Sequence, residues 1–232
     1  MDMALPDVSI VLVCWNTRDL LLACLASLAE AVGDLRADVW VVDNASGDGS
    51  VEALRSRFPH VHMIANARNI GFAAANNQAI MRSAGRYVLL LNSDTLPPPG
   101  SIARLVRFAD DRPSAGIVGP LLLYPDRRVQ HAGMFLAAMG QGRHAFRGRR
   151  KRQTGAARHF VQRQHRPLVQ CLQDSEHGGC TASGGLHSRS IFLEQRDKTL
   201  RGLDGAGRRR FDAFEKEVKP RFPVAHRPYA IQ

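Results

Sequence analysis

Three short polar clusters each follow an apolar run of the chain. They are Cys14-Trp15-Asn16, Asp43-Asn44 and Asn92-Ser93-Asp94. The carboxyl ends of neighbouring parallel strands meet at one edge of a sheet, and the ligands of such sheets bind there. If the apolar runs are parallel strands, the clusters share one crevice, where carboxylate and amide groups can bind a cation, a nucleotide base or a sugar.

The third cluster has the residue types of a metal site. The carboxylate of Asp94 can bind Mg²⁺ or Mn²⁺ beside a diphosphate, and such a metal neutralises the charge that develops on a leaving diphosphate. Asn92 stands two positions earlier. The alternative interpretation is an ordinary turn, because Asn, Ser and Asp are common where strands end.

The other two clusters could contact a nucleotide base. The carboxylate of Asp43 can accept the imide N–H of uracil or thymine, although an Asx turn into the following Asn-Ala-Ser-Gly stretch explains the residue equally well. Trp15 could stack on the base, or it could be a half-buried aromatic at a helix start. Asn16 and Thr17 can cap the helix that follows.

A fourth group of amides lies further along the chain. Asn69 and Gly71 open an alanine-rich helix that contains Asn76 and Asn77. Asparagine is disfavoured in helix interiors, so two together indicate polar contacts, for example to sugar hydroxyls. The alternative is a solvated face with one capping asparagine.

Apolar periodicity indicates the elements that position these side chains. Short runs rich in apolar and β-branched residues predict strands, at 8–13, 39–42, 61–65, 87–91, 117–118 and 121–123. Helical spacing recurs at 20–32, 51–58, 71–84 and 102–109, and the third helix is expected to close at Gly85. This alternation predicts an α/β fold with a mostly parallel sheet flanked by helices.

The net charge of +11 is unevenly placed. Residues 1–142 hold 12 Lys and Arg against 13 Asp and Glu, whereas residues 143–232 hold 20 against 8. We therefore predict a first domain over 1–142 and a basic, degenerate or disordered region over 143–232. The basic runs of this region lack interleaved aromatics, so nucleic acid is not an expected partner.

Cysteine usage and hydropathy bear on the compartment. The four cysteines show no paired spacing, which favours a reducing environment. Met1–Asp7 lacks the features of a signal peptide, and no run approaches 18 apolar residues. We expect a cytoplasmic protein, with peripheral attachment at the inner face of the plasma membrane as a further option.

Five segments together resemble the family 2 glycosyltransferases, especially the rhamnosyltransferase-like bacterial members. In chain order they read VSIVLVCWNTRDLLLACLASL (8–28), VWVVDNASGDGSVEAL (39–54), NARNIGFAAANNQAI (66–80), GRYVLLLNSDTLPPPGSI (85–102) and AGIVGPLLLYPDRRVQHAG (115–133). The resemblance implies a GT-A fold, a UDP- or dTDP-linked sugar donor, Mg²⁺ or Mn²⁺, and inverting transfer to a cell-surface glycan or lipid-linked acceptor.

The resemblance also assigns roles to individual residues. Asp43 would contact the base, and metal binding would rest chiefly on Asp94, because Asn stands at position 92 where the family has its first acid. The candidate contacts to the nucleotide sugar are Trp15, Asn16, Asp43, Asn69, Gly71, Asn76 and Asn92.

The chain departs from the family where the general base belongs. After a Val-Gln-His-Ala-Gly stretch such as 129–133, the family continues to an apolar segment and an acidic pair that supplies the base. That pair is not found here, and the remaining candidates are Asp204, Asp212, Glu215 and Glu217. Without a base, acceptor activation would lose roughly a hundred- to ten-thousand-fold. An out-of-frame tail from about residue 145 is one hypothesis for the departure.

Three functions follow from these observations. The first is an active inverting glycosyltransferase whose base lies between residues 204 and 217. The second is a catalytically impaired remnant that binds a nucleotide sugar. The third is a protein that binds anionic surfaces through its basic tail, and the donor motifs of the first 142 residues make it the weakest of the three.

Overall fold

The structure is a computed structural model. It describes residues 5–113, 115, 117–132, 134–136, 142–144, 147–150, 159–162 and 192–195. Its main sheet has the strand order β10-β5-β11-β4-β1-β2-β3.

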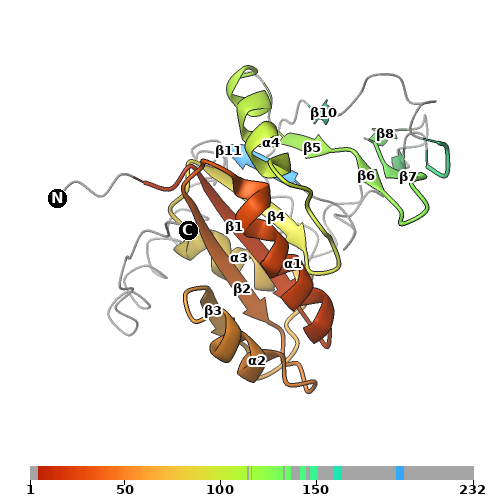
Figure 1. The fold of residues 1–232 in the computed structure, drawn as a ribbon. Coiled ribbons are helices and arrows are strands. Elements are labelled where there is room, and N and C mark those ends of the chain that lie inside the picture. Colours follow the sequence, from red (N-terminus) through yellow and green to blue (C-terminus); the bar gives the residue numbers. More distant parts are fainter. Residues whose placement is uncertain are drawn as a thin grey trace.

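Four parallel strands form one side of this sheet, and helices connect them (Figure 1). The strands are β1 (Val8–Cys14), β2 (Ala37–Asp43), β3 (His62–Ala65) and β4 (Tyr87–Asn92). The helices are α1 (Arg18–Val32), α2 (Ser50–Arg57), α3 (Phe72–Arg82) and α4 (Ser101–Asp110). The predicted α/β fold with its mostly parallel sheet is confirmed.

Later parts of the chain extend the sheet beyond β4. The strand β11 (Phe192–Gln195) pairs antiparallel with β4 and with β5 (Ile117–Pro120), so β5 runs in the same direction as β4. The strand β10 (His159–Gln162) pairs antiparallel with β5. Two strands of the sheet thus come from beyond residue 142. The division into a domain over 1–142 and a region over 143–232 stays a prediction.

Two small sheets follow β5. The strand β6 (Leu122–Leu123) pairs antiparallel with β7 (Val129–His131). The strand β8 (Met134–Leu136) pairs antiparallel with β9 (Gly142–His144).

The hydrophobic core lies on both faces of the parallel strands. Alternate residues of β1 point to opposite faces, as the two-residue period of a strand requires. Ile10 and Leu12 belong to the cluster that includes apolar residues of α1 and α4, whereas Val11 belongs to the cluster that includes α3. All six residues of β4 are buried, which explains the continuous apolar run in its sequence.

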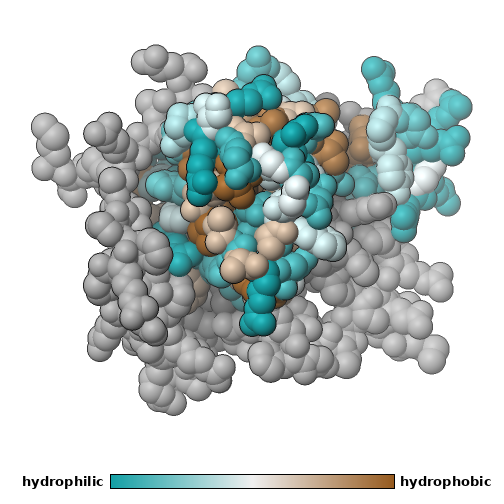
Figure 2. Space-filling model, turned by 90° about the horizontal axis from the view of Figure 1, so that it is seen from below, coloured by the Kyte–Doolittle hydropathy of each residue, from teal (hydrophilic) through white to brown (hydrophobic). Residues whose placement is uncertain are grey.

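The strand order creates one preferred place for a ligand. The chain passes outward from β1 through β2 to β3 and then returns to β4 on the other side of β1. At such a reversal, the connections on the two sides diverge and leave a crevice at the carboxyl ends of the strands. Figure 2 views the molecule from this end of the sheet.

The prediction that Gly85 closes the third helix is wrong. The helix α3 ends at Arg82, and Ser83 follows it in an extended conformation. Gly85 instead lies against β1, where its N–H donates to Ser9 Oγ at 2.8 Å. A Cβ at this position would lie 2.6 Å from Ser9 Oγ and 2.8 Å from the backbone carbon of Val8, so close backbone approach explains the glycine.

Replacing Gly85 with alanine is expected to lower the free energy of unfolding by about 3 kcal/mol, because the Cβ overlaps backbone that cannot move away cheaply. Denaturant titration measures this loss. Gly47→Ala is the matched control, since nothing lies within 4 Å of the Cβ position there. Equal stability of the two variants would contradict the packing argument.

Candidate functional site

The structure brings the three polar clusters together at the carboxyl end of the sheet. The hydroxyls of Thr17 and Ser93 lie 3.1 Å apart and join the segments that follow β1 and β4. The N–H of Asn44 donates to the carbonyl of Cys14 at 2.8 Å and joins the ends of β1 and β2. The clusters therefore form one site at the reversal point of the sheet.

Asp43 ends β2 and is only 3% exposed. Its Oδ2 accepts the N–H of Ser46 at 2.9 Å, which is the Asx turn that the sequence offered as an alternative. Its Oδ1 lies 3.7 Å from the sulfur of Cys14. Each carboxylate oxygen can accept further hydrogen bonds, so contact between Asp43 and a base stays a prediction.

Asn44 organises this end of the sheet, a role that sequence reasoning missed. It is 3% exposed, and its Nδ2 donates to Asn69 Oδ1 at 2.8 Å and to the carbonyl of Gly71 at 3.3 Å. Its Oδ1 accepts the N–H of Ile70 at 3.1 Å and Nδ2 of Asn66 at 3.3 Å. One buried amide thus holds the whole segment that leads into α3.

Replacing Asn44 with alanine is expected to cost about 2 to 4 kcal/mol of stability, because several partly buried polar groups lose their partner together. Denaturant unfolding tests this. Asn77→Ala is the control, because Asn77 Oδ1 is buried without a partner among the described residues, and its removal should be nearly neutral. A small loss at Asn44 alone would argue against its organising role.

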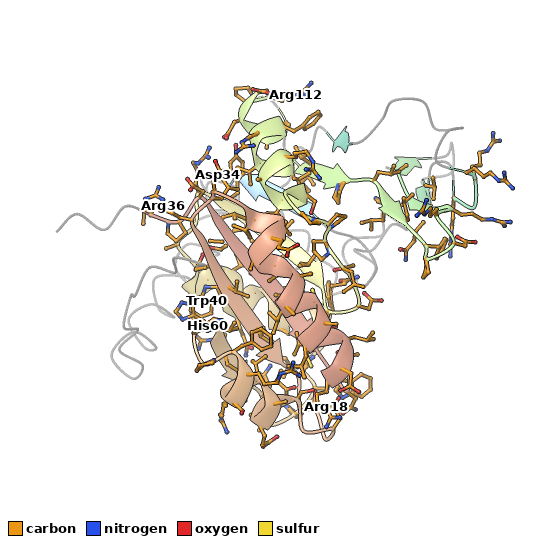
Figure 3. All side chains as sticks on the ribbon, viewed as in Figure 1. Arg18, Asp34, Arg36, Trp40, His60 and Arg112 are labelled. Carbon is orange, nitrogen blue, oxygen red and sulfur yellow. The ribbon has the colours of Figure 1, made fainter. Side chains whose placement is uncertain are left out.

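The start of α1 is held by a residue from another loop. Neither Asn16 nor Thr17 caps the helix with its side chain. Asp48 does so instead, since its Oδ2 accepts the N–H of Arg18 at 2.8 Å. Figure 3 shows Arg18 at this end of the molecule, far from Asp34 and Arg36 at the opposite end. The prediction that Asn16 or Thr17 caps α1 is wrong. The capping residue, Asp48, lies thirty residues from Arg18 in the sequence, so local spacing does not reveal it.

Asn16 holds the loop after β2 through two hydrogen bonds. Its backbone N–H donates to Ser46 Oγ at 2.9 Å, and its Oδ1 accepts the N–H of Gly47 at 2.8 Å. Asn16 adopts a positive φ of 54°, which asparagine tolerates better than most residues. Beside it, Trp15 is 57% exposed, so its ring is accessible to a ligand.

The segment after β4 presents Asp94 to solvent. Asn92 is 7% exposed, and its carbonyl accepts the hydroxyl of Thr95 at 2.6 Å. Among the described residues, Asn92 Nδ2 has no hydrogen-bond partner. Asp94 lies within this turn and is exposed.

The thiol of Cys24 lies beneath this segment. Burial raises the pKa of Cys24 to about 11, the Thr95 hydrogen bond lowers it, and the negative charge of Asp94 raises it further. The thiol is therefore protonated at neutral pH. It packs as a small apolar group under the site rather than acting as a nucleophile.

The remaining predicted contacts take different positions. Asn69 and Gly71 are exposed, and Asn69 Oδ1 accepts the N–H of Gly71 at 2.9 Å. Asn76 is 1% exposed, and its Nδ2 donates to the carbonyl of Phe72 within α3 at 2.8 Å. The sugar contact of Asn76 stays a prediction. The base candidates Asp204, Asp212, Glu215 and Glu217 lie outside the described residues.

The residues at the site fit a metal held largely by its substrate. In the described part of the chain, no group of three or more His, Cys, Asp or Glu side chains could hold a metal ion. Mg²⁺ is commonly bound by one or two carboxylates together with substrate phosphates and waters. The exposed carboxylate of Asp94 matches that pattern.

Comparison with known proteins identifies the class. The family model for glycosyl transferase family 2 matches residues 9–174, which is well over half of the chain. The chain therefore belongs to glycosyl transferase family 2. The resemblance inferred from the five sequence segments is confirmed.

Curated relatives cover the first part of the chain. An N-acetylglucosaminyl-diphospho-decaprenol L-rhamnosyltransferase of Mycobacterium tuberculosis (strain H37Rv) is 32% identical over 129 residues, which cover 51% of this chain and 42% of that protein. An N-acetylglucosaminyltransferase of Bradyrhizobium elkanii is 33% identical over 125 residues, covering 51% and 68%. The chain thus spans less than half the length of the mycobacterial relative.

A solved structure supports the fold. Residues 1–349 of S. aureus TarS, in complex with UDP, match with a TM-score of 0.50 and 16% identity, covering 76% of this chain and 52% of that one. This likeness confirms the GT-A fold. Among the helices that the structure describes, none combines the length and apolar character that crossing a membrane requires.

Proposed function

We propose that this glycosyltransferase transfers a sugar, with inversion, from a UDP- or dTDP-linked donor to a cell-surface glycan or a lipid-linked acceptor. The observation that carries the proposal is the placement of Asp43 at the carboxyl end of β2 and of Asp94 just after β4, on either side of β1. A nucleotide sugar needs both a base contact and a means of neutralising its diphosphate. Those two carboxylates can meet the two needs from one crevice.

Each side chain has a proposed task. Asp43 accepts the imide N–H of the base, and Trp15 stacks on the ring. Asn16, Asn69, Gly71, Asn76 and Asn92 contact the nucleotide sugar. Because Asn44 and Asp48 fix the loops around these groups, the site is organised before the ligand binds.

Asp94 would hold the Mg²⁺ or Mn²⁺ ion together with the donor diphosphate. When bound, the ion supplies Lewis-acid stabilisation of the departing nucleoside diphosphate. Asn92, an amide in place of a second acid, is a weak metal ligand beside a carboxylate, so the protein's share of the binding rests chiefly on Asp94.

The activities for which relatives are named support the acceptor class. One relative is a rhamnosyltransferase named for a diphospho-decaprenol acceptor, and another, from Myxococcus xanthus, is named for O-antigen biosynthesis. We therefore place the reaction in the cytoplasm, at the inner face of the plasma membrane, where a lipid-linked acceptor is accessible.

A second candidate function rests on the missing acidic pair after residue 133. A chain without a general base would bind the sugar donor but transfer it slowly. Asp204, Asp212, Glu215 and Glu217 remain the proposed sources of the base.

Turnover separates these two candidates. The purified chain is incubated with UDP- and dTDP-linked sugars, Mn²⁺ and a polyprenyl-diphosphate-linked N-acetylglucosamine, and product is followed by mass spectrometry. Transfer that is lost in Glu215→Gln or another single base variant supports the active enzyme. Tight donor binding without transfer to any acceptor favours the impaired form.

A further inference from the structure

Five exposed arginines lie outside the site described above. They occupy the turn between β6 and β7 and a second segment at 147–150, and we name them the arginine cluster: Arg127, Arg128, Arg147, Arg149 and Arg150. Asp126 is the one acid in the two segments 124–128 and 147–150. The cluster therefore carries a local charge of about +4.

The backbone holds these arginines side by side. The N–H of Arg127 donates to the carbonyl of Tyr124 at 2.9 Å, which closes the turn. Val129 exchanges hydrogen bonds with the second segment, accepting from Gly148 N–H at 2.8 Å and donating to the Arg149 carbonyl at 2.9 Å. Arg128 stands directly opposite Arg150 in an antiparallel bridge. Two basic segments far apart in sequence thus form one surface.

This arrangement is electrostatically unfavourable by itself. Like charges directly opposite each other on paired strands repel. The ion pair between Arg128 and Asp126, at 3.5 Å, is about 60% exposed on both sides and compensates little. The surrounding sequence is strongly basic, with 11 Lys and Arg and no Asp or Glu between Asp126 and Asp174. An anionic partner would remove the repulsion.

We propose that the arginine cluster docks the enzyme on a bilayer that contains anionic phospholipids. The proposal rests on the proposed function, in which the acceptor is lipid-linked. Guanidinium groups bind phosphate in a bidentate manner and are attracted to anionic leaflets. Figure 2, which views the site end of the sheet, shows hydrophilic atoms on the side where Figure 1 places β6 and β7.

Exposed apolar side chains near the site fit the same partner. Leu20, in the first turn of α1, and Leu96, in the segment after β4, are 52% and 68% exposed. Exposed apolar side chains beside a basic surface can enter the interfacial region of a bilayer. Nucleic acid fits less well, because the two segments that carry the cluster, 124–128 and 147–150, contain one aromatic residue, Tyr124, and so offer no row of stacking rings. The Tyr124 hydroxyl accepts a hydrogen bond from Arg147 Nε at 3.3 Å.

Vesicle sedimentation with the full chain tests the proposal. Vesicles of phosphatidylcholine alone are compared with vesicles that also contain phosphatidylglycerol. The test variant is Arg127→Gln with Arg149→Gln, and the matched control is Arg55→Gln with Arg57→Gln, which removes the same charge from exposed positions on α2. Thermal unfolding confirms that both variants fold.

We expect salt-sensitive binding to anionic vesicles only, about twenty-fold weaker in the cluster variant and within about three-fold of the original in the α2 variant. Equal losses in both variants, unchanged binding of the cluster variant, or tighter binding to a single-stranded oligonucleotide than to vesicles would overturn the proposal. Titration of the same proteins with UDP keeps the two proposals separate, since failure of UDP binding counts against the donor site and not against the cluster.

Discussion

Replacing Asp94 with alanine is expected to abolish the metal-dependent part of nucleoside diphosphate binding. Asp94 is the exposed carboxylate at the end of β4, and the described residues offer no alternative cluster of metal ligands. Because a bound metal stabilises diphosphate charge by several kcal/mol, affinity in the presence of Mn²⁺ should fall by roughly a hundred-fold or more. Calorimetric titration with UDP or dTDP, with and without Mn²⁺, measures the effect.

The control for this variant is Asp34→Ala. Asp34 is an exposed aspartate that pairs with Arg107 at 2.6 Å, at the end of the sheet opposite the site (Figure 3). It should leave nucleotide binding unchanged. Unaltered Mn²⁺-dependent affinity in the Asp94 variant would rule out the role given to that carboxylate.

Replacing Asp43 with asparagine is expected to weaken nucleotide binding by about ten- to a hundred-fold, whether or not metal is present. The new side chain keeps one oxygen for the N–H of Ser46, so the turn after β2 can persist. The second oxygen becomes an NH₂ group, which cannot accept the imide N–H of a base. The size of the loss follows from the 1.5 to 3 kcal/mol typical of a hydrogen bond to a charged group.

An alanine variant distinguishes the role of Asp43 in the turn from its role in ligand binding. Asp43→Ala removes the turn acceptor as well, so it should also lower the unfolding temperature, whereas the asparagine variant should unfold close to the original chain. A loss of affinity that appears only with metal would be evidence against the base contact, because it would place Asp43 with the diphosphate instead.

The fold class could be predicted from the pattern of apolar residues in the sequence. Buried runs such as those of β1 and β4 are almost entirely apolar, and the helices between them show a clear period, so the α/β class follows directly. The convergence of the polar clusters then follows from the common direction of the strands. The strand topology therefore places the three polar clusters in one site.

Long-range contacts could not be predicted from the sequence in the same way. Asp48 caps α1, and Asn44 organises the segment before α3, yet in sequence both stand inside an ordinary turn signal. The role of Gly85 depends on its approach to Ser9, 76 residues away. Local propensity favoured a helix-ending glycine there, and tertiary contact decided otherwise. The arginine cluster likewise exists only because two distant segments pair.

The most direct test of the central claim is calorimetric titration of the purified chain with UDP and dTDP, each with and without Mn²⁺. We predict that one of these nucleotides binds with a Mn²⁺-dependent gain in affinity, which is the behaviour of a donor site built on Asp43 and Asp94. Absence of binding to both nucleotides under all conditions would contradict a working sugar-donor site in this chain.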